Sequence, residues 1–298
     1  MVYGTGMVSA KRSDFVKLHV YGHGIMKLVH FKRAIRRAGY ELSEKNKEKI
    51  RNAIAEGKKK AKAARDAGEG KFEKTKDNLA RTKADLLTTA LCNRFDYFCT
   101  FTQDKLLRDR YDVKAFKRGF RDFIVRENQK RKRKLKVESA NLSYVLIFEK
   151  HDDGAWHAHG IICGLQDYEM RDFEPSQTLP DYIRGKLEQG KDVKAWKAYE
   201  KQFGYCLIEP IVSPVKTARY MVKYVTKDAL RNVKEYGERI FVASVGLAKA
   251  KKYTGTLIHD MSLPVSFKNE YCAVWDIETV GALETVNNYI VWDNASSN

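Results

Sequence analysis

Residues 144–163 have the sequence YVLIFEKHDDGAWHAHGIIC, in which two apolar segments flank Asp152-Asp153-Gly154. Aspartate followed by glycine between two such segments is typical of a tight β-hairpin turn. We therefore predict antiparallel strands over residues 144–148 and 156–163. With the turn centred near Asp153, cross-strand partners have numbers that sum to about 306, which places Glu149 opposite His157 on the same face.

The segments around this hairpin predict the rest of a sheet. Residues 97–102 (YFCTFT) are aromatic and β-branched and predict another strand, and residues 207–211 and 239–244 predict two shorter ones. Apolar residues at helical spacing predict helices over residues 111–128, 193–203 and 216–230. This irregular alternation favours an α+β fold with a central antiparallel β-sheet and flanking helices.

The two ends of the chain differ in composition from this middle part. Lys, Glu and Ala dominate residues 41–67, and helical patterns are also expected at 26–37 and 72–92. We therefore expect a basic, mostly helical N-terminal segment over residues 1–93 and an α+β domain over residues 94–255. That domain would end in a basic helical stretch reaching about residue 252, and residues 256–298 would form a C-terminal extension or docked tail.

Charge is distributed unevenly along the 298 residues. The net charge is +18, and residues 1–140 alone hold 37 Lys and Arg against 17 Asp and Glu. Such an excess indicates a polyanionic partner, most simply a phosphate backbone, without separating DNA, RNA and anionic lipid. The densest basic run is a candidate phosphate contact: Lys130, Arg131, Lys132, Arg133 and Lys134.

The five cysteines are widely spaced and include no CxxC pair, which disfavours a zinc ribbon or a disulfide scaffold. The first ten residues lack a basic region followed by an apolar stretch, and no run approaches eighteen apolar residues. These patterns predict a protein without membrane contact in the reducing cytoplasm of a bacterial host cell.

The pair His157-Ala158-His159 is the first candidate for chemistry. Side chains two apart on a strand face the same way, so both imidazoles and the opposing Glu149 would converge on one face. Such a three-ligand site suits Mg²⁺ or Mn²⁺ beside a phosphate. His151 stands at the edge of the turn and is a weaker ligand candidate. A purely structural histidine pair is the alternative.

The second candidate is the predicted helix around Tyr220-Met-Val-Lys-Tyr-Val-Thr-Lys227. Tyr220 and Tyr224 are four residues apart, as are Lys223 and Lys227, so each pair shares a helix face. Neighbouring ammonium groups favour phenolate, which can attack a phosphate as a nucleophile. An amphipathic helix with packed tyrosines and solvated lysines is the alternative.

In its order of motifs, the chain over about residues 91–250 resembles the HUH endonucleases, in particular the rolling-circle replication initiators (Rep proteins) of bacterial plasmids and small single-stranded DNA phages. Residues 98–102 look like the family's first motif, a strand near the origin DNA, which implies that Thr100 and Thr102 contact DNA. Residues 156–160 look like its metal-binding strand, and residues 220–227 look like its nucleophile helix. Residues 109–112 and 203–206 also look like segments of such proteins.

The resemblance implies a specific reaction. Family members nick single-stranded origin DNA by attack of a tyrosine on a phosphodiester, keep the 5′-phosphate as phosphotyrosine and free a 3′-hydroxyl primer. Paired tyrosines can then initiate and terminate in turn, so Tyr220 and Tyr224 are both candidate nucleophiles, with Lys223 and Lys227 beside them. The family's acidic ligand often precedes the histidine pair at about the distance of Glu149. Which tyrosine attacks first stays open.

The sequence also departs from some relatives. No GxxxxGK[ST] motif occurs, so a host helicase and host replication machinery are expected as partners. A transposase or relaxase with the same chemistry is an alternative, as is a non-catalytic DNA-binding regulator with structural histidines. The role of residues 1–93, the metal's identity and the oligomeric state are not determined by the sequence.

Overall fold

The structure is a computed structural model that describes residues 12–33, 76–135, 141–174, 178–225, 239–278 and 282–293, with isolated positions between 48 and 59. The chain forms two compact units, which are treated separately below. Unit 1 comprises Met1–Lys71 and Lys249–Asn298, and unit 2 comprises Phe72–Ala248. Across the described ranges, no helix has the length and apolarity needed to cross a bilayer.

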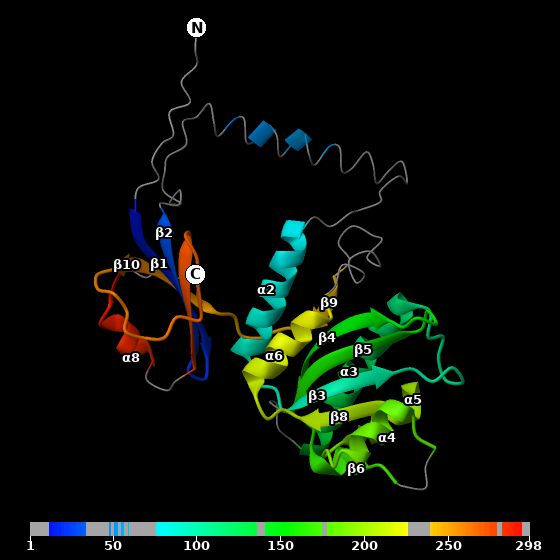
Figure 1. Ribbon diagram of the computed structural model, residues 1–298. Coiled ribbons are helices and arrows are strands. Elements are labelled where there is room, and N and C mark those ends of the chain that lie inside the picture. The colour runs from blue at the N-terminus through cyan, green and yellow to red at the C-terminus, as the bar shows by residue number, and fades with distance from the viewer. Residues whose placement is uncertain are drawn as a thin grey trace. The chain divides into compact units, whose positions relative to one another are not determined.

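Unit 2 is built on an antiparallel sheet of seven described strands, with the predicted hairpin near its centre (Figure 1). In sheet order the strands are β6 (Met170–Asp172), β7 (Lys194–Trp196), β8 (Cys206–Pro210), β3 (Tyr97–Thr102), β5 (Trp156–Cys163), β4 (Ser143–Lys150) and β9 (Phe241–Ala243). Glu149 pairs with His157, as the hairpin arithmetic predicts. The α+β fold with a central antiparallel sheet is confirmed.

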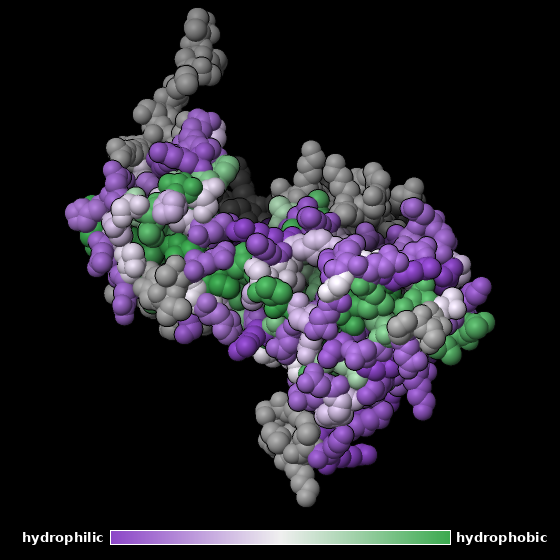
Figure 2. All heavy atoms as spheres, turned by 60° about the horizontal axis from the view of Figure 1, so that its bottom comes forward, coloured by the Kyte–Doolittle hydropathy of each residue, from purple (hydrophilic) through white to green (hydrophobic). Residues whose placement is uncertain are grey.

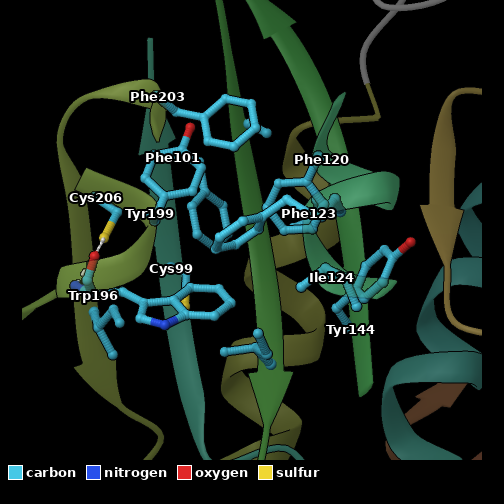
Figure 3. Packing of buried hydrophobic residues seen from close by; sticks show 14 of the residues in the cluster. Cys99, Phe101, Phe120, Phe123, Ile124, Tyr144, Trp196, Tyr199, Phe203 and Cys206 are labelled. Atoms are coloured by element: carbon cyan, nitrogen blue, oxygen red, sulfur yellow. Dashed lines mark hydrogen bonds between the residues drawn. The ribbon is translucent and has the colours of Figure 1, made fainter. Parts of the chain in front are cut away.

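One face of this sheet carries the aromatic core of unit 2. Helix α3 (Val113–Leu135) and the short helix α5 (Lys197–Phe203) cover it. The ring of Phe123 lies 4.8 Å from that of Trp196 and 5.5 Å from that of Phe203, centroid to centroid. Figure 3 shows this packing, including the hydrogen bond between Cys206 and Trp196. Burying so many large rings is the main stabilisation of the sheet.

The opposite face of the sheet is covered only in part by helices of unit 2. Helix α4 (Asp181–Glu188) packs over the β7–β8 edge through Ile183, which lies in a cluster with Leu207. Helix α6 (Pro214–Lys223) begins at the N-cap Ser213, whose hydroxyl accepts from the Lys216 amide, and α2 (Lys76–Cys92) packs beside it (Figure 1). This second face holds the candidate site.

Unit 1 is an antiparallel sheet of six described strands that joins the two ends of the chain. In sheet order they are β11 (Phe267–Lys268), β12 (Cys272–Glu278), β2 (Ile25–Arg33), β1 (Arg12–Gly22), β10 (Lys251–Leu257) and β13 (Ile290–Trp292). One sheet face is buried with the short helix α8 (Ala282–Asn287), through residues such as Leu18 and Val286. In the view of Figure 2, hydrophilic residues dominate the visible face of each unit.

Several predicted elements differ from those observed. The helix predicted over residues 26–37 is wrong where the structure describes it, because β2 runs from Ile25 to Arg33 and pairs on both sides. The helix predicted over 193–203 is strand β7 followed by α5, and the helical stretch expected to about residue 252 is wrong because β10 begins at Lys251. The helix expected over 41–67 falls mostly outside the described residues.

The segment 256–298 is not a separate tail in the described ranges. Strand β12 pairs with β2 over seven residues, and β13 pairs with β10. Because one strand of each pair comes from a distant part of the sequence, neither the pairing nor its partner can be inferred from local patterns. The N-terminal strands therefore depend on the C-terminal ones to complete their sheet.

Candidate active site

Two imidazoles and a carboxylate converge on the open face of the central sheet. His157 Nε2 and His159 Nε2 lie 2.8 Å apart, and Glu149 Oε2 lies 3.2 Å from the first and 3.3 Å from the second. His157 is buried and Glu149 is partly exposed, so the cluster opens to solvent on its Glu149 side. Among the described residues, it is the cluster of His, Cys and acidic groups that could hold a metal ion.

The spacing of these atoms fits a shared cation. Ligands bound at about 2.1 Å lie about 3.0 Å apart around an octahedral ion and about 3.4 Å apart around a tetrahedral one. The three observed separations fall close to this interval, although two ring nitrogens and a carboxylate oxygen must otherwise share protons to sit together. The donor set therefore fits a divalent metal held by Glu149, His157 and His159.

The surroundings keep these groups in the states that a metal requires. Hydrogen bonds from His157 and His159 lower the pKa of Glu149 to about 2, so its carboxylate is ionised at neutral pH. Burial lowers the pKa of His159, which favours its neutral, metal-binding form. The site is therefore prepared for a cation by its own contacts.

Two neighbours set the orientation of the ligands. Thr100 Oγ1, on β3, lies 3.3 Å from His159 Nδ1, so a hydrogen bond there directs Nε2 toward the cluster. Gly160 follows on the opposite sheet face, where a Cβ would lie 2.1 Å from Leu146 Cδ2 and 2.8 Å from the Val145 carbonyl oxygen. Only glycine lets the two strands pack this closely beside the histidines.

The hairpin that carries Glu149 and His157 is also held at its turn. The Arg110 guanidinium contacts the Asp153 carboxylate at 2.8 Å, and the Trp156 amide donates to the Arg110 carbonyl at 2.7 Å. Asp112 follows Arg110 and accepts hydrogen bonds from the first amides of α3. Residues 109–112 thus have a structural role that explains their presence beside the site.

Helix α6 brings both candidate tyrosines to the metal cluster. The Tyr224 ring stacks on the His159 imidazole with centroids 3.9 Å apart and planes 17° apart. The Tyr220 ring meets Phe98 edge-on at 5.4 Å, and Phe98 also stacks near His159. The combination of strand β3, the histidine strand and the tyrosine helix therefore forms one continuous site.

The two phenols are linked but not equivalent. The Tyr224 hydroxyl donates to the Tyr220 oxygen at 2.7 Å. Burial, followed by the nearby Tyr220, raises the pKa of Tyr224 far above its usual value near 10, so this donor keeps its proton. Tyr220 is 43% exposed and accepts that proton's hydrogen bond. Its oxygen is therefore the more accessible of the two.

Of the two predicted lysines, one can be placed. Lys223, the last residue of α6, is exposed and has its Nζ 5.1 Å from the centroid of the Tyr220 ring. Its ammonium group thus accompanies the exposed tyrosine. Lys227 lies outside the described residues.

The predicted DNA contacts are divided by the structure. Thr100 and Thr102 lie on the site face of β3, but Thr100 contacts His159 and Thr102 contacts the Tyr182 hydroxyl at 3.2 Å. The basic run continues helix α3 rather than forming a loop, and it lies on the opposite sheet face. Lys130 pairs with Glu127, while Lys132, Arg133 and Lys134 are exposed on the helix surface.

Arg131 is the exception within the basic run. Its side chain is buried, forms an ion pair with Glu169 and donates to the Gly164 carbonyl oxygen. A side chain so enclosed is not presented to a phosphate backbone, so the expectation of a DNA contact at Arg131 does not fit its position. The helical period explains the difference, because one position in this run must face the sheet.

Two site residues were missed by the sequence analysis. Phe98 contacts His159 and Tyr220, and Tyr182 reaches Thr102 from helix α4. Strand alternation alone places Phe98 on the face of Thr100, so that signal was available. The contact of Tyr182 depends on the packing of α4 and has no local signature.

Comparison with known proteins points in the same direction as this geometry. No curated protein and no solved structure matches the chain. Residues 96–229, which include β3, the histidine strand and helix α6, match the model of the family described as "Replication-associated protein ORF2". This match supports a replication initiator family for the chain.

Proposed function

We propose that this protein nicks and rejoins single-stranded origin DNA in rolling-circle replication, through a covalent 5′-phosphotyrosine intermediate and with a divalent metal. The observation that carries the proposal is the contact between Tyr224 and His159, because it joins a hydrogen-bonded tyrosine pair to a metal-binding triad. The match of residues 96–229 to a replication-associated family favours replication over transposition. The motif order supports assignment to the HUH endonucleases.

Tyr220 is the better candidate for the first attack. Its hydroxyl is accessible, it accepts a hydrogen bond from Tyr224, and the Lys223 ammonium group lies near its ring. A donated hydrogen bond and a nearby cation both stabilise phenolate relative to phenol. Tyr224 is then the reserve nucleophile, and it would act in termination once the first tyrosine is occupied.

The proposed nick is a transesterification with no change in oxidation state. The Tyr220 oxygen attacks the phosphorus and loses its proton to solvent, while the bond from phosphorus to the 3′-oxygen breaks. The leaving 3′-oxygen takes up a proton and becomes the primer hydroxyl. Rejoining reverses these steps, with the 3′-hydroxyl attacking the phosphotyrosine and returning the phenol.

Glu149, His157 and His159 would hold the ion, and Thr100 would orient His159. A bound Mg²⁺ or Mn²⁺ polarises a phosphodiester and stabilises the charge that develops on it. Mn²⁺ suits a mixed imidazole and carboxylate set better than Mg²⁺, which prefers oxygen ligands throughout. Lys223 would neutralise charge on the phosphate from the side of the helix.

The test uses 3′-labelled single-stranded DNA tiled across the replicon that carries the gene. With Mn²⁺ we expect a protein–DNA band that survives a denaturing gel and is absent with EDTA. Trypsin cleaves after Arg219, Lys223 and Lys227, so Tyr220 and Tyr224 fall in separate peptides and mass spectrometry identifies the modified one. Tight, salt-dependent binding without any adduct on either strand would instead identify a non-catalytic regulator.

A further inference from the structure

The second face of the unit 1 sheet carries a set of side chains unlike that of its buried face. Strand alternation puts Val16 and Leu18 in the core, and therefore puts Phe15, Lys17 and His19 on the other face. The registers of β2, β10 and β12 extend this face across the sheet. We call it the outer face of unit 1.

The registers arrange the outer face in three rows. The first row places Phe31 opposite Phe15, the second places Lys17 between Val29 and Thr254, and the third places His19 between Lys27 and Lys252. Lys17 and Lys252 are exposed, and the other side chains of these rows are partly exposed. An aromatic row thus lies directly beside a basic one.

The aromatic row is already associated with a cation. The Phe15 and Phe31 rings lie 5.9 Å apart at 31°, and Lys17 Nζ lies 5.7 Å from one centroid and 5.8 Å from the other. Two rings at this separation present neighbouring π-faces or edges to a planar ligand. An ammonium group beside them supplies the countercharge for an anion attached to that ligand.

The basic row is dense enough to affect its own titration. The pKa of His19 is lowered by burial and then by the charges of Lys252, Lys27 and Lys17, so three ammonium groups surround it. Acidic groups on this face, Asp276 and Glu278, belong to β12 at the other side of β2. The positive charge is therefore concentrated over β1 and β10, next to the aromatic pair.

We propose that the outer face of unit 1 binds single-stranded DNA, with bases stacking at Phe15 and Phe31 and phosphates contacting Lys17, Lys27 and Lys252. Unpaired bases stack on aromatic side chains of an antiparallel sheet, whereas a duplex hides its base faces. An anionic membrane would use the lysines but would have no need of partly exposed rings held on a flat sheet. This inference does not rest on nicking, and it stands even if unit 2 cuts nothing.

The first experiment measures binding of the full-length protein to labelled oligo-dT in EDTA, where metal-dependent cleavage cannot occur. We expect Phe31→Leu to weaken binding about tenfold, because stacking is worth a factor of roughly 5 to 150 per base. The double variant Lys17→Ala/Lys252→Ala should reduce the slope of log affinity against log salt by about 1.4, or 0.7 for each lost phosphate contact. Oligo-dT should bind more tightly than a duplex of equal length.

The chain provides a matched control in the neighbouring residue of the same strand. Lys251 and Lys252 are both exposed, but Lys251 pairs with Val20 and points to the other face. Lys252→Glu should weaken binding several times more than Lys251→Glu, although both change the net charge equally. Equal effects of the two substitutions would overturn the proposal, because they would reduce it to net charge. Circular dichroism and the Tm show whether each variant is folded.

The second experiment locates the contact directly. Oligonucleotides with 5-iododeoxyuridine are cross-linked by light to the full-length protein in EDTA, and tryptic peptides are analysed. We expect adducts on residues 13–17 and 28–32, which contain Phe15 and Phe31. Adducts confined to residues 72–248 would overturn the proposal. Failure of the proposed nicking activity would leave these cross-links unchanged, so the two conclusions can fail separately.

Discussion

The ring of Tyr224 lies flat against the imidazole of His159, with centroids 3.9 Å apart and planes 17° apart. One residue belongs to the turn that ends helix α6 and the other to the centre of strand β5. Since His159 is also one of the three converging ligand groups, the position of the tyrosine helix and the geometry of the metal cluster depend on each other. Changes at either residue should therefore affect both.

The two tyrosines should respond differently to loss of their hydroxyl groups. Tyr220→Phe removes the proposed first nucleophile and should abolish the initial adduct on a denaturing gel. Tyr224→Phe keeps the ring on His159 but removes one hydrogen bond to Tyr220, worth about 1 kcal/mol, so the initial rate should fall roughly fivefold. The reverse order of effects would show that Tyr224 attacks first.

Thr100 should act on the metal through His159. Thr100→Val keeps the side chain's shape but removes the hydroxyl near His159 Nδ1, and we expect the Kd for Mn²⁺ to rise about tenfold by calorimetry. Thr100→Ser should restore most of the affinity. Thr102→Val is the matched control, because Thr102 lies on the same face of β3 but contacts Tyr182 instead. An equal loss in both valine variants would argue against this positioning role.

Metal affinity should fall in acid and stay nearly flat near neutrality. The pKa of Glu149 is lowered to about 2 by hydrogen bonds from His157 and His159, and burial lowers that of His159. These ligands are therefore already anionic and neutral, respectively, at about pH 7 to 8. Acidification protonates imidazoles, and protons then compete with Mn²⁺. Calorimetric titrations over a pH series measure this, and tighter binding in acid would contradict the proposed ligand set.

Arg131 should matter for stability, whereas its neighbours should matter for surface charge. Arg131→Ala leaves Glu169 buried without its ion-pair partner, which should cost about 3 to 5 kcal/mol of unfolding free energy. Arg133→Ala removes the same charge from an exposed position and should change stability by no more than about 0.5 kcal/mol. Urea unfolding measures both. Similar small effects would mean that the Arg131 contacts add little.

Local patterns in the sequence determined the part of the fold that carries the site. Turn chemistry at Asp153-Gly154 and strand alternation predict the pairing of Glu149 with His157, and the structure has that pairing. The strand over 97–102 and the helix around Tyr220 follow from equally local signals. These features could be predicted because the interactions that select them act within a few residues or across one short turn.

Only the tertiary structure decided how the remaining parts meet. The stacking of Tyr224 on His159, the contact of Thr100 with that histidine and the burial of Arg131 each join segments separated by tens of residues. The same holds for unit 1, where β12 pairs with β2 and turns a predicted helix into a strand. Helical propensity is worth a few tenths of a kcal/mol per residue, so long-range pairing and burial outweigh it. Side-chain chemistry thus follows from the sequence, while the partners of each group follow from packing.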